Sequence, residues 1–231
     1  MYSFLLKIPM KNNYLLLNSS LTFVSATLWQ QCIHELAHFL TAYYVGSSQV
    51  SIYHNYVDHS SENLSSSENI LIAAAGPIMS LILGIIFHFI CYRIKRRDWT
   101  FQFLLYLSVF GYINFGGYLM IAPFFVYGDT GYVFNQLGFS PISVYLFSAT
   151  GILFLFFIIK FMSPFFSQLA NYETIMNHKE KNIFLKNTII FPLFIGIILT
   201  TILNLPVPSL LSLLYPLFSP FTLLWNYKAI M

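Results

Sequence analysis

Residues 29–46 read WQQCIHELAHFLTAYYVG, an apolar segment that nevertheless contains His34, Glu35 and His38. The whole chain of 231 residues is 57% hydrophobic and only 8% charged. A soluble domain carries about 25% charged residues, so this composition predicts a membrane protein. Ionisable groups are costly inside a bilayer and are usually kept there for a function. The segment therefore combines the features of a membrane-spanning helix with those of a functional site.

Long apolar runs predict an all-α polytopic membrane protein with six spanning helices. The expected helices cover residues 19–45, 69–92, 100–126, 142–162, 188–203 and 207–226. Pro216 and Pro220 should kink the last of them. Neither an internal repeat nor a separate soluble domain is visible, so residues 1–231 are expected to form a single membrane domain.

In this topology, the basic residues lie on one side of the membrane. The first connection between expected helices contains no Lys or Arg, whereas the second contains four of them in YRIKRRD, residues 92–98. This alternation continues, so that all 11 basic residues flank the same side of the membrane. Cytoplasmic loops carry the excess of basic residues, and we expect a multi-pass protein of the cell membrane with both termini in the cytoplasm. The net charge of +3 is explained by this topology and implies no nucleic-acid partner.

The sequence HELAH matches the pattern H-E-x-x-H. Residues i and i+4 lie on one face of an α-helix, so His34 and His38 can bind the same metal ion. Glu35 then lies close to the ion and can take a proton from the attacking water and pass it to the leaving amine. Zinc is the expected metal, because it activates water and polarises the scissile carbonyl. The structural alternative is a pair of core histidines with Glu35 as a buried partner, and it requires the costly burial of an ionisable group.

A zinc hydrolase needs a third protein ligand and an open fourth position. Most other acidic residues fall in the first exposed loop or on the cytoplasmic side, which leaves Asp129 in APFFVYGDTGYVF, residues 122–134. His34 is expected about 10–17 Å below the outer surface, from the rise of its helix. Asp129 must therefore turn inward, and a proline and two glycines in its segment suit such a turn. The reserve ligands on the same side are His54, Asp58 and His59.

Three motifs together resemble the site-2 proteases, which are intramembrane zinc metalloproteases. They are HELAH followed by VSIYHNYV, AAAGPIMSLILG in the next expected helix, and APFFVYGDTG near the end of the third. The resemblance covers residues 19–132 as a catalytic core, and residues 133–231 are expected to form additional transmembrane helices. It implies zinc bound by His34, His38 and Asp129, with Glu35 as base and acid, and a short β segment after the first helix. The implied activity is hydrolysis of a membrane-spanning or membrane-associated protein or peptide substrate in the lipid bilayer.

Some features depart from the family pattern. Ser80 stands where the family usually has an Asn that is thought to hold the substrate or the transition state, and it can still supply a hydrogen bond. Thr130 follows Asp129 where the family has Gly. Asn114 could bind the substrate backbone in the cleft or tie two helices together. The basic residues also predict an active site nearer the outer face, whereas the family holds its metal nearer the cytosolic face.

Two functions without proteolysis are compatible with the same motifs. A zinc-binding membrane protein with an immunity or sensor role, derived from a protease scaffold, would keep the three ligands and tolerate the loss of Glu35. A metal transporter would need more ionisable residues along a path through the membrane, and the other expected helices contain almost none. The presence of Glu35 favours a zinc metalloendopeptidase over both.

Overall fold

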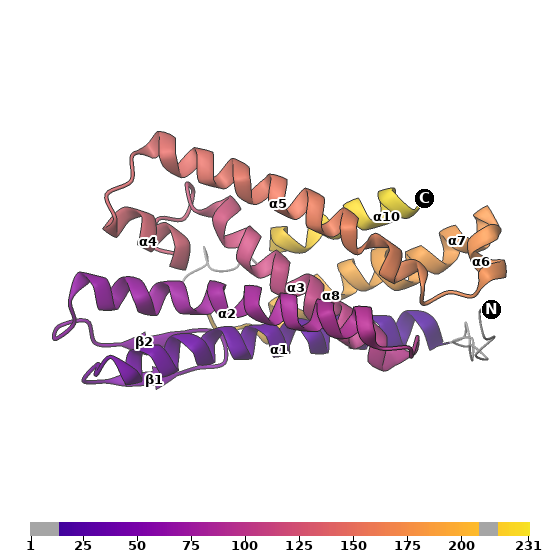
Figure 1. Cartoon of the computed structure of the whole chain (residues 1–231). Helices are drawn as coiled ribbons and strands as arrows, with labels where there is room; N and C mark the ends of the chain where they lie inside the picture. Colours follow the sequence, from indigo (N-terminus) through magenta and orange to yellow (C-terminus); the bar gives the residue numbers. More distant parts are fainter. Residues whose placement is uncertain (1–13, 208–216) are drawn as a thin grey trace.

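The computed structural model of the chain describes residues 14–207 and 217–231, which form a helical bundle with one short hairpin (Figure 1). Two of the helical elements are not α-helices: η2 (Lys186–Ile190) is a π-helical segment and η4 (Ser219–Leu223) is a 3-10 helix. The elements follow in the order α1 (Leu15–Tyr44), β1 (Val50–Ile52), β2 (Val57–His59), α2 (Ser66–Arg93), α3 (Trp99–Ile121), α4 (Asp129–Gln136), α5 (Pro141–Ser167), α6 (Tyr172–Met176), α7 (His178–Leu185), η2 (Lys186–Ile190), α8 (Phe191–Leu203), η4 (Ser219–Leu223) and α10 (Leu224–Ile230).

Four helical segments of the described residues are long and apolar enough to cross a membrane, which supports an all-α membrane protein. They are Ser66–Arg93, Trp99–Ile121, Pro141–Ser167 and His178–Leu203. The expected number of six is therefore corrected to four by this measure.

The first and the last expected helix are not among these candidate membrane-spanning helices, for different reasons. Helix α1 is long enough, with 30 residues, but its Asn, Gln, Ser, His and Glu side chains make it too polar. The last expected helix, 207–226, is not continuous, because residues 217–226 include the 3-10 helix η4 ahead of α10. Pro220 lies in the first turn of η4, where its missing N–H is tolerated. Residues 208–216 lie outside the described part of the chain.

The ends of the central helices follow local signals. Helix α2 begins with a capping box, in which Ser65 Oγ accepts a bond from the Glu68 N–H and the Glu68 carboxylate accepts one from the Ser65 N–H. The Asp98 carboxylate caps α3 by accepting bonds from two backbone N–H groups of its first turn. Helix α3 stops at Ile121, short of the expected residue 126, because Pro123 follows.

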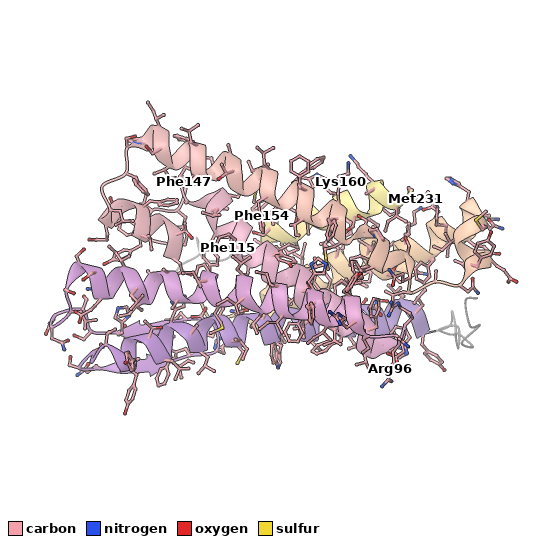
Figure 2. The ribbon with its side chains drawn as sticks, in the orientation of Figure 1. Arg96, Phe115, Phe147, Phe154, Lys160 and Met231 are labelled. Atoms are coloured by element: carbon pink, nitrogen blue, oxygen red, sulfur yellow. The ribbon has the colours of Figure 1, made fainter. Side chains whose placement is uncertain are left out.

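Helix α3 is the centre of the bundle and packs against α1, α2 and α5 (Figure 1). Phe115 of α3 and Phe154 of α5 meet edge to face, with ring centroids 5.8 Å apart (Figure 2). On the opposite side, a Cβ atom at Gly111 would lie 2.7 Å from the Gly84 Cα atom of α2. Small residues allow this close approach of the two helices. It brings Asn114, one turn beyond Gly111, next to α2.

The two ends of the bundle differ in charge. The N-terminal end of α1, the α2–α3 connection, α6 and α7 gather at one end, and the hairpin and α4 lie at the other (Figure 1). In Figure 2, Arg96 and Phe147 are at opposite ends of the molecule. The basic residues of the described part all belong to the α2–α3 connection with its flanks, the last third of α5, the α7–η2 segment or α10: Arg93, Lys95, Arg96, Arg97, Lys160, Lys179, Lys181, Lys186 and Lys228. We call the end at the α2–α3 connection and α7 the basic end.

The expected β segment is an antiparallel hairpin, in which Val50 pairs with His59 and Ile52 with Val57. Its tip is attached to the end of α8. The Asn55 side-chain amide donates hydrogen bonds to the carbonyls of Asn204, at 2.6 Å, and Pro206, at 2.9 Å. The hairpin is thereby held beside α1 and α8 at the end opposite the basic end (Figure 1).

Candidate metal centre

The three side chains predicted to bind a metal lie together in the structure. His34 and His38 come from one face of α1, and Asp129 is the first residue of α4. The His34 Nε2 atom lies 3.1 Å from His38 Nε2 and 3.0 Å from Asp129 Oδ2, and His38 Nε2 lies 3.3 Å from the same oxygen. Ligand atoms bound at about 2.0–2.1 Å to a tetrahedral zinc ion are about 3.3–3.4 Å apart. The three atoms thus form a triangle close in size to one face of a zinc coordination tetrahedron.

The second nitrogen of each histidine is held by α2. His38 Nδ1 lies 2.7 Å from the carbonyl oxygen of Ile72, and His34 Nδ1 lies 3.1 Å from Ser80 Oγ. A carbonyl oxygen only accepts hydrogen bonds, so we assign the proton of neutral His38 to Nδ1, which leaves a lone pair on Nε2. The same tautomer of His34 directs a second lone pair toward the Asp129 carboxylate. Two imidazoles and one carboxylate, oriented in this way, fit a zinc ion.

One face of α2 is shaped around the two histidines. Ile72, Gly76 and Ser80 are spaced four residues apart and therefore lie one above the other on the helix. A Cβ atom at Gly76 would lie 2.3 Å from His38 Nε2 and 2.6 Å from His34 Nε2. Glycine at this position leaves room for both rings, while the residues one turn before and after it hold their Nδ1 atoms.

Asp129 reaches the histidines because the chain turns inward after α3. The turn contains Pro123 and continues to Gly128, after which Asp129 begins α4. A Cβ atom at Gly131 would lie 2.2 Å from the carbonyl oxygen of Phe125, so the turn closes tightly only with glycine there. This is the inward turn that the proline and the glycines of the segment predict.

The two histidines keep the Asp129 carboxyl group ionised. Burial alone raises the pKa of this group, but without a bound metal the charge of a protonated His38 and hydrogen bonds from Nε2 of both histidines outweigh burial and hold the pKa well below its usual range. A carboxylate is the form that binds a metal cation. The side chain is still partly exposed, and it faces a cavity on the hairpin side of the bundle.

Two cavities meet at the nearly buried Glu35 side chain. The outer cavity, of about 400 Å³, also touches His38, Asp129 and strand β2. The inner cavity, of about 90 Å³, lies on the other side of Glu35 along α1. Tyr118 borders both cavities, and its ring stacks on that of His34 with centroids 5.1 Å apart. Besides His34, Glu35 and Tyr118, the polar side chains around the inner cavity are Thr27, Gln30, Gln31, Asn55, Asn114 and Asn204.

Ser80 and Asn114, which we predicted to bind substrate, are connected to each other. Ser80 is fully buried, and its Oγ atom accepts a hydrogen bond of 3.2 Å from Asn114 Nδ2 in addition to its contact with His34. Ser80 is not among the residues that line either cavity, whereas Asn114 borders the inner one. The pair therefore links α3 to a histidine of the centre, with Asn114 still facing the inner cavity.

The reserve ligands do not join the cluster of ligand atoms. His54 contacts the carbonyl oxygen of Asn204, and His59 lies 3.4 Å from Asn69 Oδ1. Asp58 pairs with Ser51 in the hairpin.

Three features of the centre were not predicted: the Ile72 carbonyl, the room left by Gly76 and the stacked ring of Tyr118. The four-residue spacing from Ile72 through Gly76 to Ser80 is a signal that could have identified the first two. Tyr118 lies in the glycine-rich stretch of α3, and nothing in its sequence context distinguishes it from other tyrosines of the chain.

Replacing Ser80 by alanine is expected to weaken zinc binding by about 10–100-fold, because His34 loses the partner that fixes its ring orientation. Competition with a chromophoric chelator measures this affinity in the purified protein. The matched control is Ser108→Ala, which removes another fully buried hydroxyl between α2 and α3, one that bonds to the Gly84 carbonyl. Equal affinities in the two variants would contradict a role of Ser80 in orienting His34.

Comparison of this chain with protein-family models, with curated proteins and with solved structures found no match.

Proposed function

We propose that the chain is an intramembrane zinc metalloendopeptidase of the site-2 protease type, which cleaves membrane-embedded or membrane-associated proteins or peptides. The observation that carries the proposal is the convergence of the His34, His38 and Asp129 ligand atoms beside Glu35, where two cavities meet. Zinc bound there would lower the pKa of a water molecule and polarise the scissile carbonyl.

Glu35 is the proposed proton carrier. It follows His34 directly on α1 and borders both cavities, so its carboxylate can accept a proton from water on one side and deliver it to the leaving amine on the other. The inner cavity supports this role, because its volume of about 90 Å³ exceeds the roughly 10–15 Å³ that one water molecule needs. Its amide and hydroxyl lining supplies the hydrogen bonds that retain water inside an apolar bundle.

The outer cavity is the proposed substrate site. Its volume of about 400 Å³ lies in the range of ligand pockets, and Tyr56, Val57 and His59 of the hairpin line it. A substrate helix must unwind before its carbonyl can react, because its backbone groups are otherwise paired within the helix. The edge of β2 that is not paired with β1 can accept the unwound segment as an added strand.

The hairpin register identifies which backbone groups of β2 are free for such pairing. Hydrogen bonds join Tyr53 to Tyr56 and Gln49 to Ser60, so the alternation of an antiparallel ladder turns the N–H of Val57 away from β1. Val57→Pro removes this N–H, and we expect at least a tenfold loss in kcat/KM for a peptide substrate, whereas Val57→Ala keeps the N–H and most of the activity. Equal rates for the two variants would rule out strand addition at this edge.

We further propose that both termini lie in the cytoplasm and that the metal centre lies nearer the outer face of the membrane. Helix α1 is about 45 Å long, which is enough to cross the membrane once. Helix α8 ends beside the hairpin, and α10 ends toward the basic end (Figure 1). The basic residues, gathered toward one end, favour the cytoplasm for that end.

A reporter fused after Ser65, at the hairpin end, is expected to be active only outside the cytoplasm. The same reporter fused after Lys95, in the α2–α3 connection, is expected on the cytoplasmic side. Accessibility to a membrane-impermeant reagent provides an independent measurement of both positions. A cytoplasmic reporter at Ser65 would overturn the proposed orientation.

One observation favours a second candidate, a zinc-binding membrane protein without proteolysis. Ser80 is buried against His34, so it offers no hydrogen bond to a substrate, unlike the Asn expected at this position in the protease family. A protein with an immunity or sensor role would need the metal centre alone.

The two candidates are separated by measuring zinc and cleavage in the same detergent-purified protein. Elemental analysis is expected to find about one zinc per wild-type chain and almost none in Asp129→Ala. A panel of synthetic transmembrane peptides, analysed by mass spectrometry, should be cut by the wild type, inhibited by 1,10-phenanthroline and restored by added zinc. Bound zinc without cleavage of any peptide would favour the second candidate, and a wild-type chain without zinc would refute both.

A further inference from the structure

A third cavity lies far from the metal centre, toward the basic end of the bundle. Its volume is about 540 Å³, and α5, α6, α7 and α10 surround it. In Figure 2, Lys160 of α5 and Met231, which follows α10, lie on the same side of the molecule. The polar and charged side chains that line it are Lys160, Ser163, Ser167, Gln168 and Lys181.

Both lysines of the cavity lack a carboxylate partner among the described residues. The Lys160 Nζ atom lies 5.1 Å from the centroid of the Phe156 ring, and Lys181 Nζ donates a hydrogen bond of 3.1 Å to the carbonyl oxygen of Ile230. An ammonium group has three donor hydrogens, so the Ile230 contact leaves two on Lys181. The cavity therefore presents two ammonium groups that form no ion pair with the described residues.

Neutral donors complete the lining. The Gln168 Oε1 atom accepts a hydrogen bond of 2.8 Å from Arg97, which orients the amide and leaves its NH₂ group to donate elsewhere. Ser167, the last residue of α5, adds a hydroxyl group. Two ammonium groups, an amide NH₂ and a hydroxyl are donors that suit the oxygens of a phosphate group.

The surface that leads to the cavity is apolar. Phe157 and Phe161 of α5 are 65% and 63% exposed, and they precede the cavity on a helix that is long and apolar enough to cross a membrane. Acyl chains packed against these rings would place a lipid headgroup at the basic end. A free phosphate ion would make no use of this apolar surface.

We propose that this cavity binds the phosphate group of an anionic phospholipid in the leaflet at the basic end, with Lys160 and Lys181 as its cationic contacts. The lipid's acyl chains run along α5 beside Phe157 and Phe161. Basic pockets between helices on the cytoplasmic side are suited to such headgroups. The proposal does not depend on proteolysis and holds for either candidate function.

The test is thermal unfolding of the full chain in a neutral maltoside detergent, with separate additions of short-chain phosphatidylglycerol, short-chain phosphatidylcholine and inorganic phosphate at equal ionic strength. A ligand at about 100 times its Kd is expected to raise the midpoint by about 5–10 °C. We expect this rise with phosphatidylglycerol alone. An equal rise with phosphatidylcholine would overturn the preference for an anionic lipid, and an equal rise with inorganic phosphate would assign the cavity to the free ion.

Charge-matched variants locate the effect. The double variant Lys160→Gln/Lys181→Gln is expected to lose the rise, while Lys179→Gln/Lys186→Gln removes the same charge from residues that do not line the cavity and should keep it. Loss of the rise in both variants, or in neither, would refute the assignment to this cavity. If the first variant fails to fold, native mass spectrometry of the wild type decides the question, because retention of phosphatidylcholine as often as phosphatidylglycerol contradicts the proposal.

Discussion

Replacement of Glu35 by glutamine is expected to abolish peptide hydrolysis while zinc remains bound at about one ion per chain. Glutamine has nearly the same shape as glutamate, but its amide cannot accept and return a proton at neutral pH. General acid–base groups contribute about 10²–10⁴-fold to rate, so kcat should fall by at least this factor. The three ligand atoms belong to other residues, and the metal content should therefore be unaffected.

The measurement is kcat on a transmembrane peptide together with elemental analysis of the same preparation. Glu62→Gln is the matched control, because it makes the same chemical change in the exposed loop between the hairpin and α2. Unchanged hydrolysis in Glu35→Gln would show that Glu35 is not the proton carrier. Loss of zinc together with activity would instead make Glu35 part of the metal site.

Replacement of Gly76 by alanine is expected to weaken zinc binding by about 100-fold or more. The new methyl group would lie 2.3 Å from His38 Nε2 and 2.6 Å from His34 Nε2, so at least one imidazole has to leave its position. A four-ligand zinc site binds with about 10–16 kcal/mol, so one ligand's share is about 2.5–4 kcal/mol, and 2.7 kcal/mol corresponds to a factor of 100. Chelator competition measures the affinity, and the absorption spectrum of the cobalt-substituted protein reports the ligand geometry.

Gly84→Ala, two turns further along α2, is the control for this variant. A Cβ atom there would lie 3.1 Å from the Tyr112 backbone nitrogen of α3, so the substitution strains a helix contact away from the histidines. It is expected to lower the unfolding temperature while leaving the zinc affinity nearly unchanged. Wild-type zinc affinity in Gly76→Ala would contradict the arrangement of α1 and α2 around the metal centre.

The sequence alone determined that His34 and His38 lie on one face of α1 and that the chain turns inward before Asp129. His34 and His38 share a helix face because the helical repeat is a local property of the backbone. The proline and glycines around Asp129 act through restrictions on their own backbone angles, and the capping box at Ser65 acts within four residues. Each of these signals is local, so each can be read from the sequence.

Tertiary structure decided which face of each apolar helix meets its neighbour. A membrane helix is apolar around its whole circumference, so hydropathy does not distinguish the face of α2 that carries Ile72, Gly76 and Ser80 from the others. The same limitation explains why Ser80 was predicted to contact substrate, whereas packing places it against His34. The number of spans was also predicted wrongly, because α1, which was expected to cross the membrane, is too polar by composition and lies among α2, α3 and α8. Contacts between distant segments set these features, and such contacts follow from the packing of complete helices rather than from any short stretch of residues.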